Sequence, residues 1–485
     1  MQINTLKRKS LSSAFWRLFE RGGRAVVELA VQIILARLLE PTDFGALAIM
    51  LVFVNVGGVF VTSGLPTALI QANEVDDTSY STVFWISLVV STVLYCVIFL
   101  LAPTIALFYR MPQIVWPLRA LCAVLLVNAY NSVQVAKVTR ELELRKTFVS
   151  TMTSVFVSGT CGAITAIAGG GLWALVIQQL LYAITNCLTL AVQVSWHPTK
   201  HFRPEEGKTL FAFGWKLLAA GLLETGYNSL SDLIVGARFS VESLGVMSQG
   251  KKYPQALGGV INGSVQPVML ATVSHVSSDM NRARAITRRA LKSSCYLVMP
   301  VMSFLACSAP ALIPALLGNQ WRDAVPYFQV FCVVNAFLPM HTTNLQALNA
   351  MGRSDLFLKL EIVKKTYGVM NLLFCAFVLG DIWLLCCSYL VTNVVSQVVN
   401  AWPNKRVLGY GYTNQIKDIA PGLLLSALGS SVAITVGFFG FSSMATIVLQ
   451  AIVFVLIYLG ASALFHVEAY EYLLRTAHEL LISRK

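Results

Sequence analysis

Long apolar runs follow one another along almost the whole chain, and short polar segments separate them. Runs of about 18 to 25 apolar residues are long enough to cross a lipid bilayer as α-helices. Fourteen such runs are centred near residues 26, 55, 92, 125, 158, 183, 222, 258, 300, 335, 368, 391, 428 and 453. Since no connection between them could hold a separate domain, the pattern predicts an all-α integral membrane protein with 14 transmembrane helices.

The composition agrees with this pattern, because 56% of the 485 residues are apolar and only 12% are charged, against about 25% in soluble domains. The chain has 36 Lys and Arg against 23 Asp and Glu, a net charge of +13. In a membrane protein this excess reports topology rather than nucleic-acid binding. With the N-terminus inside, 23 basic residues fall on inner segments and four on outer segments, which predicts both termini on the cytoplasmic side. The ten cysteines lie in apolar runs without metal-ligand spacing, so neither disulfides nor a metal are expected.

Two pairs of segments repeat along the chain. Segment 36–47, ARLLEPTDFGAL, matches 237–247, ARFSVESLGVM, and the match aligns Gly45 with Gly245; a second match aligns Trp173 with Trp383. Internal repeats are common in secondary transporters, whose substrate site lies between the two halves. The repeats predict two lobes with a pseudo-two-fold relationship. The predicted parts are a cytoplasmic N-terminus (1–13), a six-span N-lobe (14–200), a six-span C-lobe (201–402), two further spans (403–465) and a cytoplasmic amphipathic tail (466–485).

Ionisable residues inside the predicted spans are candidates for a functional site, because each is costly to insert and therefore faces a cavity or a partner. Nine are basic and five are acidic, which predicts a cationic cavity. In the first span, Arg21, Arg24 and Glu28 share one helical face. The predicted substrate-binding residues are Arg21, Arg24, Glu28, Lys216, Lys251, Lys252 and Lys364. For Arg21 the alternative is a side chain that reaches the inner headgroups.

Two carboxylates, Glu224 and Asp232, lie on one face of the seventh predicted span. A hard cation requires oxygen ligands, and a proton relay requires a group whose pKa can shift. These residues are therefore candidates for a sodium or proton site, although pairing with Lys251 or Lys252 would explain them equally well. The two adjacent lysines lie near the predicted bilayer middle and together suit a doubly charged group such as a diphosphate.

The sequence resembles the polysaccharide-transporter (Wzx-type) flippases of the multidrug/oligosaccharidyl-lipid/polysaccharide (MOP) exporter superfamily, most of all the colanic-acid-exporter type. Four stretches carry the resemblance: ILARLLEPTDFGALAI (34–49), VTRELELRKTF (138–148), LLGNQWRDAVPYFQVFCVVN (316–335) and LNAMGRSDLFLK (348–359). The sequence departs from the family at GKKYPQ (250–255), where two lysines stand at a place expected to be apolar or singly polar.

The resemblance implies a MATE-like fold of two lobes around a V-shaped cavity, with alternating access. It implies a monomer that exports oligosaccharide on undecaprenyl diphosphate across a bacterial inner membrane, with polysaccharide polymerase machinery as a partner. Related lipid flippases bind sodium through the seventh, eleventh and twelfth spans. By position, this implies a site formed by Asp232, Asn371 and Thr392.

Two other functions are compatible with a polytopic membrane protein. A cation-coupled drug antiporter of the same superfamily would need an acidic, aromatic cavity, whereas the excess here is basic. A membrane-embedded glycosyl polymerase or ligase would need a sizeable outer loop with catalytic residues, and the predicted outer segments are short. We therefore expect a transporter rather than an enzyme, with no cofactor beyond a coupling Na⁺ or H⁺.

Overall fold

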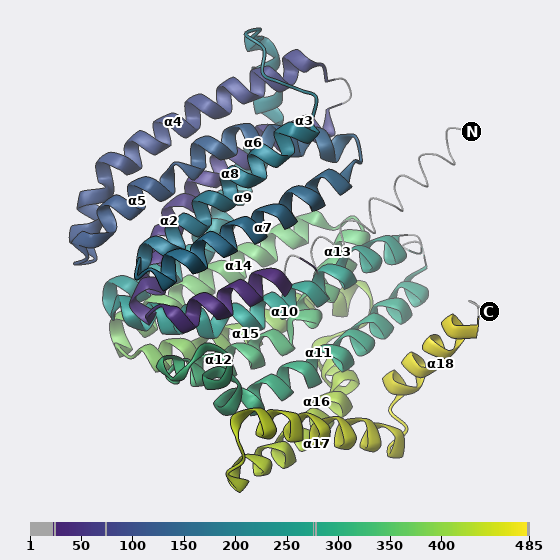
Figure 1. Ribbon diagram of the computed structural model, residues 1–485. Coiled ribbons are helices and arrows are strands. Elements are labelled where there is room, and N and C mark those ends of the chain that lie inside the picture. Colours follow the sequence, from purple (N-terminus) through teal and green to yellow (C-terminus); the bar gives the residue numbers. More distant parts are fainter. Residues whose placement is uncertain (1–22, 24–25, 73–74, 275, 277–278, 483–485) are drawn as a thin grey trace. The chain divides into compact units, whose positions relative to one another are not determined.

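The computed structural model describes residues 23, 26–72, 75–274, 276 and 279–482, and every regular element within them is helical (Figure 1). Eleven of the described helical segments are long and apolar enough to cross a membrane. They are Pro41–Gln71, Asp77–Phe108, Pro112–Arg140, Leu144–Ile167, Leu172–Gln193, Met280–Leu317, Ala324–Ala350, Leu356–Leu379, Ile382–Val407, Tyr412–Phe439 and Ser443–Leu464. The chain is therefore an all-helical, multi-pass membrane protein.

The other three predicted spans fall on more polar parts of the chain. Helix α9 (Pro204–Arg238) has 35 residues and α10 (Val241–Ser274) has 34, which is long enough to cross a bilayer. Both interrupt their apolar sequence with charged residues. Residues 26–38 are helical as well, and a bend follows at Leu39. The count of 14 spans stays a prediction, because only eleven segments meet the apolar criterion.

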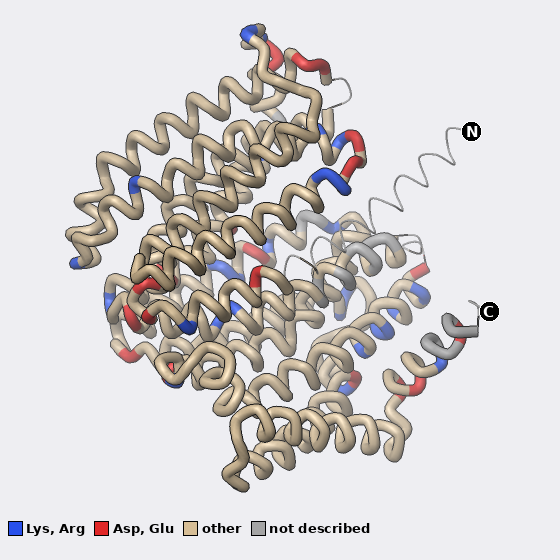
Figure 2. Tube along the Cα trace, viewed as in Figure 1, with Lys and Arg blue, Asp and Glu red and all other residues tan. Residues whose placement is uncertain are grey.

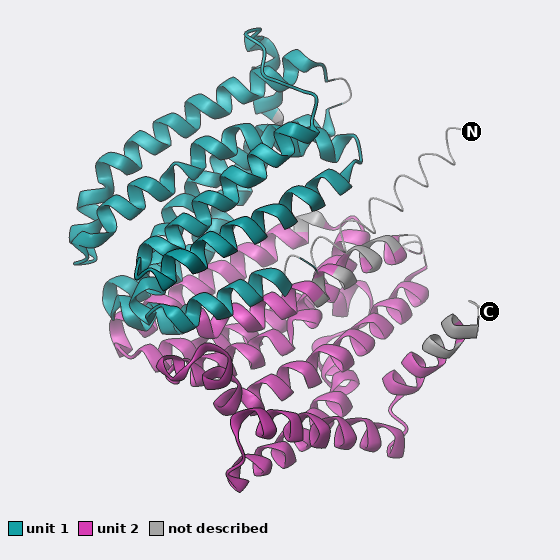
Figure 3. Ribbon diagram, in the orientation of Figure 1, with its two compact units in different colours: residues 1–248 teal, residues 249–485 magenta. Residues whose placement is uncertain are grey.

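The chain divides into two compact units, residues 1–248 and residues 249–485 (Figure 3). The division falls inside α10. The predicted lobe boundaries at residues 200 and 402 are not tested by this division and stay predictions. Each unit has its own packed helices.

Unit 1 is a bundle in which α4, α6 and α8 lie side by side (Figure 1). Besides α9, its elements are α2 (Pro41–Thr62), α3 (Leu65–Gln71), α4 (Asp77–Phe108), η1 (Pro112–Ile114), α5 (Val115–Cys122), α6 (Val124–Arg140), α7 (Leu144–Ile167) and α8 (Leu172–Gln193). Small residues allow close packing of membrane helices. On α7, a Cβ added at Gly162 would lie 3.1 Å from Gln178 Cβ of α8, so glycine sets the separation of these two helices.

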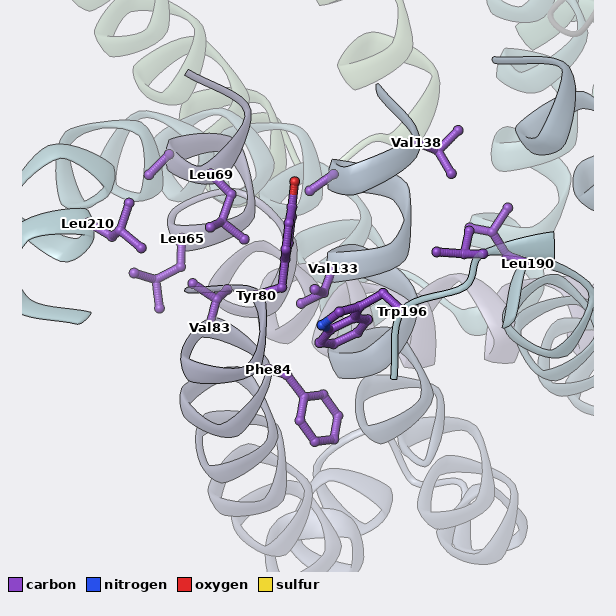
Figure 4. Close-up of a cluster of buried hydrophobic side chains, with 13 residues drawn as sticks. Leu65, Leu69, Tyr80, Val83, Phe84, Val133, Val138, Leu190, Trp196 and Leu210 are labelled. Carbon is purple, nitrogen blue, oxygen red and sulfur yellow. The ribbon is translucent and has the colours of Figure 1, made fainter. Parts of the chain in front are cut away.

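A buried aromatic cluster fixes one end of unit 1 (Figure 4). Trp196 follows α8 and is 2% exposed; its ring lies 6.0 Å from that of Tyr80 and 5.8 Å from that of Tyr130. The segment after it runs along the start of α4, where Thr199 N donates to Ser81 Oγ at 3.0 Å. This connection is thus bound to the bundle over its length and positions the start of α9.

Unit 2 is built around the long helix α11 (Met280–Leu317), whose first half carries five basic residues (Figure 2). The other elements are η2 (Asn319–Trp321), α12 (Ala324–Ala336), α13 (Leu338–Ala350), α14 (Ser354–Leu373), the π-helical η3 (Phe374–Leu379), α15 (Ile382–Val407), α16 (Tyr412–Val436), η4 (Gly437–Phe439), α17 (Ser443–Leu464) and α18 (Glu468–Ile482). Tyr458 Oη donates to the carbonyl of Tyr296 at 2.8 Å, and Tyr296 Oη donates to Ser462 Oγ at 2.7 Å. These buried bonds join α11 to α17.

Candidate functional site

Unit 1 contains a polar cavity of about 540 Å³. Helices α2, α5, α6, α8 and α9 line it, so the cavity lies entirely within this unit. Its polar lining consists of the carboxamides Asn55, Asn128, Asn131, Gln179, Asn186 and Asn228 and the hydroxyls Thr62, Tyr182, Thr225 and Ser229. Among the described residues, none that lines the cavity is charged.

Helical periodicity brings these groups together. On α2, Asn55, Gly58 and Thr62 follow i, i+3, i+7 spacing, and on α8 Gln179, Tyr182 and Asn186 follow the same spacing. Residues at this spacing share one helical face. Each helix therefore presents a polar stripe to the same space.

Some of the lining amides are held by protein partners. Asn186 is buried, and its Oδ1 accepts a hydrogen bond from Ser150 Oγ at 2.9 Å. Asn228 Nδ2 donates to Glu224 Oε1, one turn earlier on α9, at 3.0 Å. These bonds fix two of the six amides on opposite helices of the cavity.

The remaining amides have unused hydrogen-bonding capacity. Within the described part of the chain, the side chains of Asn55, Asn128 and Gln179 make no hydrogen bond. Asn131 Oδ1 is buried and has no partner there either. A carboxamide offers both donors and acceptors. The cavity therefore offers hydrogen-bond donors and acceptors but, among its described lining residues, no charge.

The charged positions of the predicted spans do not reveal this cavity, because none of its described lining residues is charged. The signal was nevertheless present in the spacing of Asn and Gln on α2, α6 and α8. What the sequence could not show is that these stripes from distant segments face one another.

The predicted cationic residues are distributed over both units. Arg21 and Arg24 lie outside the described residues. Glu28 is half-buried in the helix of residues 26–38, and Lys216 is exposed on α9. The proposed cationic stripe of the first span is thus not tested by the structure.

Lys251 and Lys252 lie within α10, in unit 2, and their environments differ. Lys251 is half-buried and Lys252 is exposed, in keeping with the rotation of about 100 degrees between adjacent helical residues. Lys364 on α14 forms an ion pair with Glu361, with Nζ 2.5 Å from Oε1. Part of its charge is therefore neutralised by its own helix.

The structure brings together two of the four residues predicted for a cation or proton site. Asn371 Nδ2 of α14 donates to Thr392 Oγ1 of α15 at 2.9 Å and to the Ser388 carbonyl at 3.1 Å. The other two, Glu224 and Asp232, belong to α9 of unit 1, where Glu224 is exposed and Asp232 half-buried.

Known proteins resemble the chain at both the sequence and structure levels. A profile of the polysaccharide biosynthesis protein family matches residues 34–326, more than half of the chain. The succinoglycan biosynthesis transport protein ExoT of Rhizobium meliloti is 22% identical over 396 residues, 80% of this chain and 78% of its own. The lipopolysaccharide biosynthesis protein WzxC of Escherichia coli is 20% identical over 422 residues, 86% and 85% of the two chains.

Two solved structures share the fold. The lipid II flippase MurJ in an inward closed conformation aligns with a TM-score of 0.73 at 12% identity, covering 94% of this chain and 99% of MurJ. An inward-facing multidrug resistance MATE family transporter of the MOP superfamily aligns with a TM-score of 0.61 at 16% identity, covering 80% and 95%. At these identities the likeness concerns the fold alone: the chain shares the helical fold of MurJ and of this MATE transporter.

Proposed function

The chain belongs to the polysaccharide biosynthesis protein family, and we propose that it moves an undecaprenyl-diphosphate-linked oligosaccharide from the cytoplasmic to the outer leaflet of a bacterial inner membrane. It is a transport protein and not an enzyme. In the outer leaflet, the oligosaccharide would serve as a building block for a cell-surface polysaccharide. Both termini would lie in the cytoplasm, as the distribution of Lys and Arg predicts.

The observation that carries the proposal is the uncharged, amide-lined cavity of unit 1. Apolar helices that enclose so many carboxamides serve a polar ligand, since polar groups are costly in a membrane. A lipid-linked oligosaccharide has a polar part of this kind, its glycan, joined to a lipid tail. A cationic drug would instead require carboxylates or several aromatic rings in the lining, and the described lining offers a single aromatic ring, that of Tyr182.

Transport would follow alternating access between two six-helix lobes within a 14-span chain. Lys251 and Lys252, with Arg24 from the first span, would attract the diphosphate. Asp232, Asn371 and Thr392 would couple the movement to sodium or protons. Polysaccharide polymerase machinery would receive the product.

A reconstituted flipping assay tests the function directly. Vesicles that contain the purified chain and an undecaprenyl-diphosphate-linked oligosaccharide with a fluorophore on the sugar are treated with membrane-impermeant dithionite. Protein-free vesicles lose only their outer-leaflet signal, whereas an active flippase exposes the inner pool as well. A plateau equal to that of protein-free vesicles, both with and without ion gradients, would contradict the proposal.

A further inference from the structure

We infer that the unit 1 cavity binds the uncharged, hydroxyl-rich sugar residues of the glycan and that the diphosphate binds elsewhere. This inference rests on the proposed function and adds a division of the substrate between two chemically distinct sites. It assigns the choice of sugar to Asn55, Asn128, Asn131 and Gln179.

The lining matches a neutral sugar better than any charged group. A sugar hydroxyl both donates and accepts hydrogen bonds, and a carboxamide does the same. A diphosphate needs cationic donors to offset the loss of its hydration, and the described lining has none. The charge of the lipid carrier is therefore excluded from this cavity, and the glycan is the part of the substrate that fits it.

The unused amides leave donors and acceptors available to a ligand. Asn55, Asn128 and Gln179 make no hydrogen bond within the described residues, and since Asn55 is exposed and the other two are half-buried, these carboxamides are accessible from the cavity. These groups gain partners only when water or ligand hydroxyls fill the space.

The size of the cavity favours a ligand over a few ordered waters. Its volume of about 540 Å³ falls in the range of about 300–1,000 Å³ that is typical of small-molecule sites. A Cβ added at Gly58, on the α2 side of the lining, would meet no atom within 4 Å. The absence of a side chain there keeps this part of the cavity open, and Tyr182 on α8 adds an aromatic residue to the lining.

Binding to two lipids that differ only in their sugar separates the sites. The probes are undecaprenyl diphosphate that carries a neutral disaccharide and undecaprenyl diphosphate without sugar, measured on the detergent-solubilised full chain by native mass spectrometry. The wild type should prefer the glycosylated lipid. The double variant Asn128→Leu/Gln179→Leu, which removes both carboxamides, should lose about tenfold in affinity for the glycosylated lipid and bind the bare lipid as before.

The control is Gln193→Leu, which makes the same change on α8 outside the cavity, where Gln193 Nε2 bonds to the Thr189 carbonyl of its own helix at 2.9 Å. It should retain the full preference. Equal binding of both lipids by the wild type, or an unchanged preference in the double variant, would overturn the inference while leaving the flippase function standing. Failure of the wild type to bind either lipid would instead contradict the proposed function. Loss of bare-lipid binding in the double variant would show that the two sites are not separate.

Discussion

Gly45 of α2 and Gly245 of α10 meet at a backbone crossing in which neither position has room for a side chain. A Cβ added at Gly45 would lie 1.8 Å from the carbonyl oxygen of Val241, and one added at Gly245 would lie 1.9 Å from the carbonyl oxygen of Pro41. The contact is reciprocal, as expected for two equivalent elements. The same two glycines were aligned by the internal repeat in the sequence, so the repeated segments are also the segments that touch.

Either glycine should therefore be intolerant of alanine. Gly45→Ala or Gly245→Ala would force the two backbones apart, and overpacking of this kind costs about 1–3 kcal/mol of stability or more. Thermal unfolding of the purified protein in detergent measures the loss. Gly226→Ala on α9 is the matched control, because a Cβ there meets nothing within 4 Å. If both Gly45→Ala and Gly226→Ala left the midpoint unchanged, the crossing would not be tight.

Gly58 offers a way to fill the unit 1 cavity without removing any polar group. A leucine at this position has space for its Cβ and would extend into the volume where we place the sugar. Gly58→Leu should slow the flipping of a lipid-linked oligosaccharide by about tenfold or more, with a larger effect for a branched glycan than for a single sugar.

Gly226→Leu serves as the control for that substitution, since it adds the same side chain to α9 at an open position outside the cavity lining. Its flipping rate should stay at the wild-type level. Equal rates in the two variants would mean that the substrate does not pass through the cavity.

The helical class could be predicted from the sequence because apolar periodicity and span length are local properties. The cavity could not, because Asn and Gln carry no charge and their significance appears only when α2, α6, α8 and α9 face one another. Lys364 is an intermediate case. Its ion pair with Glu361 follows from a spacing of three residues on one helical face, whereas the prediction of substrate binding rested on the excess of basic residues in the spans.

Asp418 of α16 binds basic residues of α11, and one of these basic residues also binds the start of α18. Arg288 donates to it from Nε and Nη2, each at 2.8 Å, Lys292 Nζ lies 3.1 Å away, and Tyr410 Oη donates at 2.8 Å. Lys292 in turn pairs with Glu468, the first residue of α18. The Asp418 side chain is only 11% exposed. Its loss would therefore leave the donor groups of its partners without their acceptor at a largely buried position.

Asp418→Asn should lower the free energy of unfolding by about 1.5–3 kcal/mol, the range for hydrogen bonds to charged groups. Glu468→Gln should cost only about 0–1 kcal/mol, because surface ion pairs are screened and the Glu468 side chain is 70% exposed. Denaturation of the two variants side by side measures the difference. The reverse order of effects would show that the anchor is Glu468 rather than Asp418.

Ion coupling should depend on Asp232 and on Asn371 together. Asp232→Asn removes a carboxylate that a hard cation would use, and Asn371→Ala removes the amide that bonds to Thr392. Each variant should abolish the stimulation of flipping by a sodium or proton gradient. Each should retain the slower flipping rate that is measured without a gradient. A gradient response that survives both substitutions would assign these residues to helix packing alone.

Lys251 and Lys252 of α10 should bind the diphosphate of the lipid carrier. A lysine at mid-membrane depth costs about 2.5 to 3.5 kcal/mol on insertion scales, and an anionic ligand offsets that cost when it binds. Lys251→Gln/Lys252→Gln keeps side-chain length and hydrogen bonding but removes two charges. Binding of undecaprenyl diphosphate, with or without sugar, should fall by about tenfold or more, whereas binding of a glycolipid without phosphate should change little.

The control is Lys405→Gln/Arg406→Gln, which removes two adjacent exposed charges at the end of α15. This control variant should bind the diphosphate lipid and the phosphate-free glycolipid as the wild type does. Lysine variants that weaken both diphosphate lipids equally, beside cavity variants that weaken only the glycosylated one, would establish two independent sites on one substrate. Equal loss of the diphosphate lipid and the phosphate-free glycolipid in the lysine variant would instead show that the pair supports the helix and does not contact the lipid.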